Sequence, residues 1–458
     1  MLTAKLMNKK PFSRLSLLSL CCAMGASGLA QSQTEAEVDE VDAVQTLMSA
    51  TPADTLHLPL GGLEALLPPC ARPDSNFITL PGGQSGAMRL FVDKMDSVLL
   101  LGSGRVSILQ IGGSHIQADM YTEVFRQRLD SLNGGLRPAR GFLFPFSVAK
   151  TNNPPGYKVR RGGEWQMARC SVRKARPALG VSGITVFTGS PAAWFSIDTD
   201  PDSAGRWLSS SLRLLARSAT GWLVPVIALD DTTLRPSVTD SLGYVFRLPR
   251  PVSHFELRFE TDTAAGAKAD TFFVDGIIPG ADDDGITFHT IGVNGASVPS
   301  YLRCELFERQ LAALRPDLVI LSIGINDASG PNFSADAFRE AYDSLLATFR
   351  RVNPRCAFIF VTNNDSKRRV RRRRRVVNAN GPVAREAFVT MAEKWHGGLW
   401  DLFGIMGGLG SMAQWQKAGL AQRDNVHFTR TGYKVIGAMF YDAFLNFYLD
   451  QEATDDND

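Results

Sequence analysis

Apolar residues occur in short, continuous runs in two parts of the chain, from about residue 85 to 157 and from about 281 to the C-terminus. Each run is as long as a buried strand, and stretches with apolar residues at helical spacing separate the runs. The predicted strands are 106–111, 286–291, 318–323 and 357–361. Strands that alternate with helices in this way predict a parallel sheet with helices on both faces.

The helices expected between these strands have apolar residues on one side. The first three stripes are Leu90, Phe91, Met95 and Val98 in the helix 88–101; Ile116, Met120, Val124 and Leu129 in a helix directly after Ser114; and Leu302, Leu306, Leu311 and Leu314 in a later helix. Further helices are predicted at about 335–351, 382–395 and 431–449.

Between about 158 and 280 the pattern changes to short segments in which apolar and polar residues alternate. Turn residues separate these segments at intervals of roughly ten residues. The segments are 183–187, 193–197, 222–227, 254–259 and 271–274. This pattern is typical of a β-sandwich, and it predicts a jelly-roll-like all-β domain inserted into the α/β domain.

The first thirty residues have the features of an export signal. Four basic residues precede an apolar stretch, and Gly28-Leu29-Ala30 supplies small residues for cleavage. The apolar stretch is shorter than the roughly 20 residues that span a bilayer, so we expect removal of 1–30 and no stable membrane insertion. We interpret 31–84 as a flexible spacer followed by an N-terminal arm. The predicted α/β domain then comprises 85–157 and 281–458.

Composition excludes some classes of protein and leaves others open. Apolar residues make up 44% of the chain, as in ordinary globular proteins, and the net charge of +3 is too small to indicate a nucleic-acid partner. Four cysteines follow the signal, namely Cys70, Cys170, Cys304 and Cys356. They allow three pairings, between which the sequence does not choose. They contain no Cys-x-x-Cys pair, so we expect no zinc site.

Three predicted strands end in residues that suit acyl-transfer chemistry. Ser114 follows Gly112-Gly113 and opens a helix, where free backbone N–H groups favour a developing anion. Gly295 lets a backbone N–H approach a substrate oxygen, and the Asn326 amide supplies another donor. Because the carboxyl ends of parallel strands meet at one edge of a sheet, we expect these groups to lie together.

A fourth element near the C-terminus supplies an acid and a base. Asp424 and His427 are three residues apart, so a tight turn places both side chains on the same side. The carboxylate can then hold one imidazole nitrogen while the other nitrogen faces the serine. His115, next to Ser114, is expected to have a structural or substrate-orienting role.

The blocks that contain Ser114, Gly295, Asn326 and His427 resemble the SGNH (GDSL-like) hydrolase family, named for these four residue types. Asp424 matches the family's acid in the Asp-x-x-His block. The resemblance implies a flavodoxin-like three-layer α/β/α fold, a triad of Ser114, Asp424 and His427, and an oxyanion hole from Ser114, Gly295 and Asn326. It implies an ester hydrolase that needs no metal or cofactor.

A finer resemblance is to the exported peptidoglycan O-acetylesterases of this family, which have a β-rich domain inserted in the hydrolase domain. It implies a periplasmic or secreted esterase whose partner is an acetylated cell-envelope glycan. Acetylxylan- or pectin-type esterases remain an alternative. One position departs from the family pattern, since Gly113 stands where an Asp usually precedes the nucleophile. A non-catalytic glycan-binding protein that lost activity through Gly113 therefore remains a second alternative.

The segment 367–375 carries the strongest local charge, with one Lys and seven Arg in nine residues. Such a run is consistent with a solvated loop or with contact to an anionic polymer, such as the carboxylates of a glycan strand.

Overall fold

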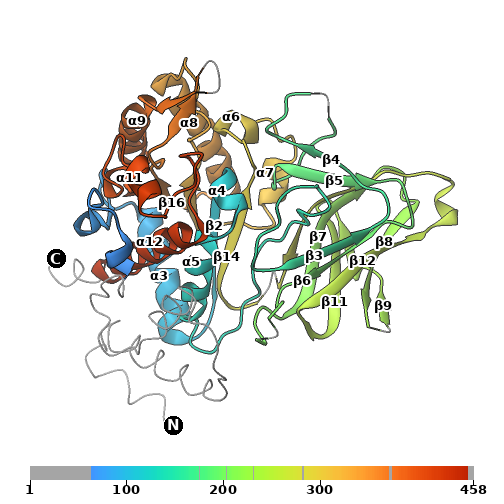
Figure 1. The fold of residues 1–458 in the computed structure, drawn as a ribbon. Helices are drawn as coiled ribbons and strands as arrows, with labels where there is room; N and C mark the ends of the chain where they lie inside the picture. Colours follow the sequence, from blue (N-terminus) through green and yellow to red (C-terminus); the bar gives the residue numbers. More distant parts are fainter. Residues whose placement is uncertain are drawn as a thin grey trace, which may run out of the picture.

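The computed structural model describes residues 63–174, 176–202, 204–230, 232–280, 283–370 and 374–451. The predicted signal segment and most of the predicted spacer lie outside these residues. An α/β unit and a β-rich unit lie side by side (Figure 1). None of the helices in the described ranges combines the length and the apolar content that crossing a bilayer requires.

The α/β unit is built on a six-stranded sheet whose main strands are parallel. Its strands are β2 (Arg105–Gly112), β14 (Gly285–Gly292), β15 (Leu318–Ser322), β16 (Ala357–Val361), β19 (Gly398–Trp400) and β1 (Ile78–Thr79). They lie in the order β14-β2-β15-β16-β19-β1, and only β1 is antiparallel to its neighbour. The five parallel strands thus have the 2-1-3-4-5 order of flavodoxin-like sheets, and the predicted parallel sheet is confirmed.

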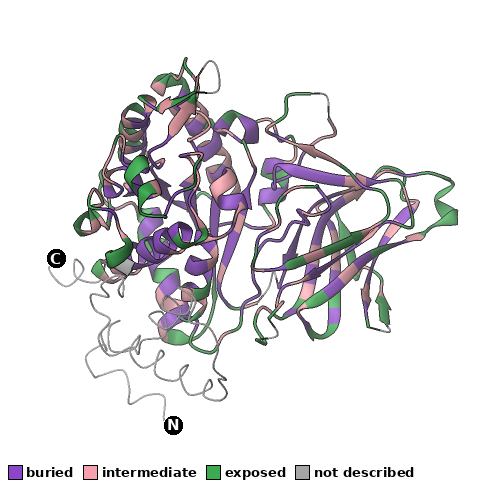
Figure 2. Cartoon of the chain, in the orientation of Figure 1, coloured by how far each residue is buried: buried purple, intermediate pink, exposed green. Residues whose placement is uncertain are grey.

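Alternate residues of each strand face two different helical layers. Ile108 and Ile320 belong to a core with α3 (Gly86–Leu101), α5 (Tyr121–Asp130) and α12 (Arg430–Asp450). Leu109 and Leu321 belong to a second core with α7 (Phe307–Leu311), α8 (Ala335–Val352) and α9 (Asn380–Lys394). Both faces of the sheet are buried (Figure 2), which explains why its strands are continuous apolar runs.

The β-rich unit, which we call the β region, connects α5 to β14 and contains two antiparallel sheets. The first has the order β10-β11-β7-β13-β5-β4 and the second β3-β6-β12-β8-β9. Their bounds are β3 (Lys158–Gly162), β4 (Gln166–Arg169), β5 (Ile184–Thr188), β6 (Trp194–Asp198), β7 (Ser209–Ser218), β8 (Leu223–Leu229), β9 (Thr232–Leu234), β10 (Val238–Asp240), β11 (Gly243–Val252), β12 (His254–Thr261) and β13 (Phe272–Pro279).

The two sheets of the β region share a core that is continuous with the second core of the α/β unit. Phe259 of β12 and Phe272 of β13 make an edge-to-face contact between the sheets, with ring centroids 4.9 Å apart. Both belong to the cluster that contains Leu321 and the buried residues of α8 and α9. The β region is therefore packed against the α/β unit through apolar side chains.

The remaining short elements lie in the connections between these strands and helices. They are η3 (Leu63–Leu66), η4 (Pro73–Ser75), α4 (Ser114–Gln117), η5 (Thr263–Ala265), α6 (Val298–Tyr301), β17 (Lys367–Arg369), β18 (Arg375–Val377), α10 (Leu402–Ile405) and α11 (Met412–Lys417). Residues near η4 contact the α/β unit, since the Asn76 amide donates to the Met439 carbonyl and accepts from the Trp400 indole.

Two predicted helices are each broken in two. The predicted helix after Ser114 divides into α4 and α5, because Asp119 has a φ of 49° that a helix does not allow. The predicted helix through Leu302 divides into α6 and α7, and Leu302 itself is exposed. The turn between these halves lets the Leu306 N–H donate to the Leu179 carbonyl of the β region. Leu90, predicted on the buried side of α3, is also exposed.

The four cysteines are free thiols. Cys170 lies in the β region and Cys304 follows α6, and their buried side chains are in hydrogen-bonding contact. Neither Cys70 nor Cys356 contacts another cysteine among the described residues; their thiols donate to the Met406 and Ala357 carbonyls.

The break at Asp119 is the centre of a buried ion-pair network. The Asp119 carboxylate accepts from both guanidinium nitrogens of Arg126 and from Arg140, at 2.9–3.2 Å. All three side chains are at most 2% exposed. Burial alone raises the pKa of this carboxyl, but the two arginines outweigh burial and lower it. The network therefore depends on a charged Asp119.

We predict that Asp119→Asn lowers the free energy of unfolding by about 3–5 kcal/mol, because it removes the more deeply buried of the two carboxylates, Asp119 and Glu123, that Arg126 and Arg140 share. Chemical denaturation measures this. Asp230→Asn is the matched control, since Asp230 also has a positive φ but pairs with Arg250 in solvent, at 76% side-chain exposure. We expect a change below about 0.5 kcal/mol there. Equal effects at both positions would contradict the prediction.

Candidate active site

Ser114 lies at the C-terminal edge of the sheet, between β2 and β14. It is the first residue of α4, and Gly113 precedes it as the N-cap. The neighbouring strand ends must be glycine for this helix to approach the sheet. A Cβ at Gly112 would meet Ile116 at 2.3 Å, and one at Gly292 would meet the Gln117 backbone nitrogen at 2.2 Å. Steric exclusion thus fixes the position of the serine.

Asp424 and His427 lie on a tight turn that leads into α12. The Asp424 Oδ1 atom accepts hydrogen bonds from the Val426 and His427 backbone N–H groups, both at 3.0 Å. Asn425, which lies between Asp424 and Val426, has a positive φ of 54°, a backbone conformation that asparagine tolerates. Thr429 caps α12, with its hydroxyl accepting from the Gly432 N–H. The turn is therefore held at both ends.

The turn carries its imidazole to the serine. His427 Nε2 lies 2.7 Å from Ser114 Oγ, and His427 Nδ1 lies 2.6 Å from Asp424 Oδ2. Partial burial raises the pKa of the Asp424 carboxyl, but hydrogen bonds from the His427 ring and from two backbone N–H groups outweigh burial and hold that pKa well below its ordinary value. The ionised carboxylate fixes the Nδ1–H tautomer, so that Nε2 is free to accept the serine proton.

Gly295 and Asn326 also lie at this edge. Gly295 has a φ of 76°, which explains the residue type there. The Asn326 side-chain amide donates to the Ala296 carbonyl at 2.8 Å. The same amide nitrogen would be 3.3 Å from a Cβ at Gly113, so Asn326 lies directly beside the nucleophile loop. The structure thus brings together all the residues predicted for the site: Ser114, Gly295, Asn326, Asp424 and His427.

His115 lies next to the His427 ring and is fully buried. Its Nδ1 lies 2.8 Å from the Tyr433 hydroxyl, and its ring centroid lies 5.1 Å from that of His427. Burial and the neighbouring His427 lower the pKa of His115 to about 3. A neutral ring packed against His427 is consistent with the predicted structural role.

A polar cluster beside Gly295 was not predicted as a unit. The Gln117 side chain accepts from the Asn294 N–H at 2.7 Å and donates to Asn152 Oδ1 at 2.9 Å. Asn294 also donates to Asn152 Oδ1, at 2.8 Å. These bonds tie the Gly295 loop to α4 and to the segment before the β region. Gln117 is three residues after Ser114, which was the available signal for it.

Asp327 contacts the end of the Gly295 loop, where α6 begins. Its carboxylate accepts from the Val298 N–H at the start of α6, at 3.1 and 3.3 Å. Burial raises the pKa of Asp327 to about 7, against smaller opposing effects of this hydrogen bond and of its own N–H. The side chain therefore changes charge near neutral pH.

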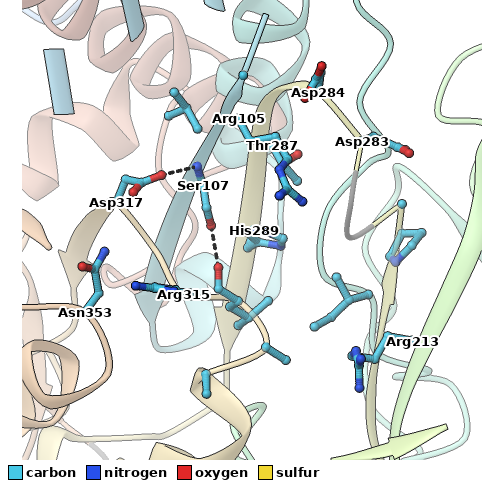
Figure 3. A pocket seen from close by; sticks show the side chains of 18 of the residues that line it. Arg105, Ser107, Arg213, Asp283, Asp284, Thr287, His289, Arg315, Asp317 and Asn353 are labelled. Carbon is cyan, nitrogen blue, oxygen red and sulfur yellow. Dashed lines mark hydrogen bonds between the residues drawn. The ribbon is translucent and has the colours of Figure 1, made fainter. Parts of the chain in front are cut away.

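A large cavity lies away from this site. Its volume is about 1900 Å³, and it lies between the N-terminal ends of β2 and β14 and the β7–β11 part of the β region (Figure 3). Ser107 and His289 line it (Figure 3), and Ser114 lies roughly 25 Å away at the other end of β2. The His289 ring accepts the Phe142 N–H, and burial keeps it neutral with a pKa of about 3. This cavity takes no part in the chemistry at Ser114.

The site contains the groups of a serine hydrolase: a hydroxyl, an imidazole, a carboxylate and nearby N–H donors at the C-terminal edge of a parallel sheet. No group of three or more His, Cys, Asp or Glu side chains that could hold a metal ion occurs in the described ranges.

Comparison with known proteins agrees with this class. The model of the GDSL-like lipase/acylhydrolase family matches residues 264–435. This part of the chain is therefore similar to the GDSL-like lipase/acylhydrolase family, and together with the site it supports an ester hydrolase. The match includes Gly295, Asn326, Asp424 and His427 but not Ser114, which the pairing of β2 with β14 brings to the site. No curated protein sequence matches the chain.

One solved structure shares the fold over most of the chain. A peptidoglycan O-acetylesterase is similar with a TM-score of 0.63 and 22% identity, covering 81% of this chain and 99% of the other. An acetyl xylan esterase has a TM-score of 0.28 and 19% identity, covering 34% and 81% of the two chains. A GDSL-like lipase from Bacteroides thetaiotaomicron has a TM-score of 0.27 and 15% identity, covering 35% and 75%.

We predict that Asp327→Asn removes a pH-dependent loss of stability. The folded-state pKa of about 7 exceeds the unfolded value, so folding favours the protonated form, and stability falls as pH rises from about 4 to the folded pKa and levels off above it. Between pH 5 and 7.5 the wild type should lose about 2–4 °C more in Tm than the variant. Asp442, whose pKa burial raises to about 6, is present in both proteins and does not contribute to this difference.

Asp336→Asn on the surface of α8, at 82% exposure, is the control for this prediction. Its Tm should fall between the two pH values by as much as the Tm of the wild type does. A Tm of Asp327→Asn that falls as steeply as the wild type's would show that another group titrates.

Proposed function

We propose that the chain is an exported serine esterase that removes O-acetyl groups from a cell-envelope glycan, with peptidoglycan as the preferred substrate. The observation that carries this proposal is the continuous hydrogen-bonded chain from Asp424 through His427 to Ser114. It lies beside Gly295 and Asn326, at the edge of the sheet where α/β proteins bind ligands.

The mechanism proposed is acyl transfer through a covalent ester. His427 Nε2 takes the Ser114 proton while Oγ attacks the acetyl carbonyl carbon. The N–H groups of Ser114 and Gly295 and the Asn326 amide stabilise the oxyanion. His427 then gives its proton to the departing sugar alkoxide. Water, deprotonated by His427, attacks the acetyl-enzyme, and collapse of the second intermediate releases acetate and restores Ser114.

The glycan substrate is supported by the likeness to the peptidoglycan O-acetylesterase. That likeness extends over 99% of the other chain and 81% of this one, a span that exceeds the α/β unit alone. We infer that residues 158–280 form an inserted domain that contributes to binding the glycan. The alternative is an acetylxylan- or pectin-type esterase, which would carry out the same chemistry on a different polymer.

Gly113 supports a different second candidate, a glycan-binding protein without activity. A side chain at this position would touch the Asn326 amide. In its absence, Asn326 is held through its bond to the Ala296 carbonyl. Because the Ser114–His427 contact forms without an acid at position 113, the active enzyme remains the favoured proposal.

We predict that Ser114→Ala lowers kcat/KM for p-nitrophenyl acetate by about 10⁴-fold or more, because nucleophile and base act as a unit. Ser344→Ala on the exposed face of α8 is the matched control and should keep full activity. Circular dichroism should show that both variants are folded. No turnover by the wild type, or turnover that Ser114→Ala leaves unchanged, would exclude the serine mechanism.

We further predict that the wild type releases acetate faster from O-acetylated peptidoglycan than from acetylated xylan at equal acetyl concentration. Enzymatic acetate determination measures both rates, with Ser114→Ala as the blank. Release from xylan alone would assign the chain to the plant-glycan esterases instead.

A further inference from the structure

The basic segment predicted from the sequence forms a hairpin beside the candidate active site. Strands β17 and β18 pair antiparallel, with Lys367 opposite Val377 and Arg369 opposite Arg375. We call the described residues 367–370 and 374–377 the basic hairpin. It carries five positive charges, at Lys367, Arg368, Arg369, Arg374 and Arg375.

The base of the basic hairpin is bonded to the loop that carries the imidazole. The Lys367 N–H donates to the Asn425 carbonyl at 2.9 Å, and the Arg375 guanidinium donates to the Asp424 carbonyl. Both acceptors belong to the turn that ends at His427. A movement of the hairpin base would therefore be transmitted to the catalytic turn.

The residues after β18 are bonded to the loop that carries the oxyanion amide. The Asn378 and Asn380 side chains both donate to the Ala328 carbonyl, at 3.1 and 2.9 Å. Ala328 is two residues after Asn326. The basic hairpin thus starts between the two loops that flank Ser114, and it forms part of the rim of the site.

The arginines of the hairpin differ from other exposed arginines in their ion pairing. Within the described ranges Arg368, Arg369, Arg374 and Arg375 take part in no ion pair, whereas exposed Arg235 and Arg351 each pair with a glutamate. Lys367 is different, because its charge lowers the pKa of Asp365 against the larger effect of burial. Uncompensated positive charge at the rim attracts a polyanion.

We propose that the basic hairpin binds the carboxylates of an anionic glycan strand and holds that strand over Ser114. This proposal rests on the proposed function, and it adds that the substrate is a charged polymer instead of a neutral one such as xylan. Several exposed arginines on one hairpin suit carboxylates spaced along a chain, since each guanidinium can donate two parallel hydrogen bonds to a carboxylate.

A membrane surface fits the basic hairpin less well. Interfacial binding combines basic residues with Trp, Phe or Leu that enter the acyl region. The described hairpin has only valines as apolar residues, at positions 370, 376 and 377. Its attachment to both catalytic loops also implies that whatever binds the hairpin is presented to Ser114.

The first test measures binding without turnover. Ser114→Ala protein is sedimented with insoluble peptidoglycan sacculi, with chitin as a neutral insoluble glycan, and with vesicles of phosphatidylglycerol and phosphatidylcholine. We expect binding to sacculi that weakens about tenfold between 20 and 500 mM salt, because exposed charges are screened. Adding Arg368→Glu, Arg369→Glu and Arg374→Glu should remove most of this binding. Arg375 is left unchanged, since it contacts the Asp424 carbonyl.

A matched control reverses three other exposed arginines, Arg137→Glu, Arg315→Glu and Arg355→Glu, which lie outside the β region at the far end of the parallel sheet. It makes the same change in net charge, so we expect it to bind sacculi nearly as well as the parent protein. Equal loss of binding in both triple variants would show an effect of net charge alone and would overturn the proposal. Stronger binding to the vesicles or to chitin than to sacculi would overturn it as well.

The second test uses protein in which Ser114 is intact, and it compares two substrates. The hairpin triple variant should raise KM for O-acetylated peptidoglycan about tenfold at low salt with little change in kcat. Its kcat/KM for p-nitrophenyl acetate, a small neutral ester, should stay within about twofold of the wild type. An unchanged KM for peptidoglycan would overturn the docking role. Failure of the esterase proposal can be told apart from failure of the hairpin proposal. In the first case the wild type hydrolyses neither substrate, while the binding test still shows whether the hairpin binds sacculi.

Discussion

A single hydrogen bond, between Ser114 Oγ and His427 Nε2, joins residues that are 313 positions apart in the chain. It forms only if the C-terminal turn returns to the end of the first parallel strand. Several features serve that closure: α12 packs on α5, Thr429 caps α12, and Gly432 leaves no room for a side chain against the Leu420 carbonyl. The last helix of the fold therefore positions the base for the first strand.

Electrostatics around this contact separate the roles of neighbouring side chains. Asp424 remains ionised because hydrogen bonds to its carboxylate outweigh the cost of partial burial. His115 remains neutral because it is fully buried and next to another imidazole. Two adjacent rings thus differ in function: only His427 has a carboxylate partner at Nδ1 and the serine at Nε2. This arrangement provides one base and avoids a second charge behind it.

Local sequence signals predicted the parts of the fold and site that depend on local constraints. The buried strands follow from apolar runs, and Asp424 with His427 follows from a three-residue spacing. The break at Asp119 was missed because Arg126 and Arg140, which stabilise its positive φ, interact with it only in the folded structure. β7 and β11 were missed because three consecutive apolar residues in β7, 214–216, and two prolines in β11, Pro249 and Pro251, break the apolar–polar alternation. The Gln117 cluster likewise joins three segments far apart in sequence.

The apolar core that runs from the helices α8 and α9 into both sheets of the β region has an architectural consequence. A module on a free linker can reorient and can be removed, but this unit cannot be excised without uncovering the flank of the catalytic sheet. Ser171 of the β region also lies near Gly295, 3.8 Å from where its Cβ would stand. The β region is therefore held in one place beside Gly295, and it belongs to the same folded unit as the parallel sheet.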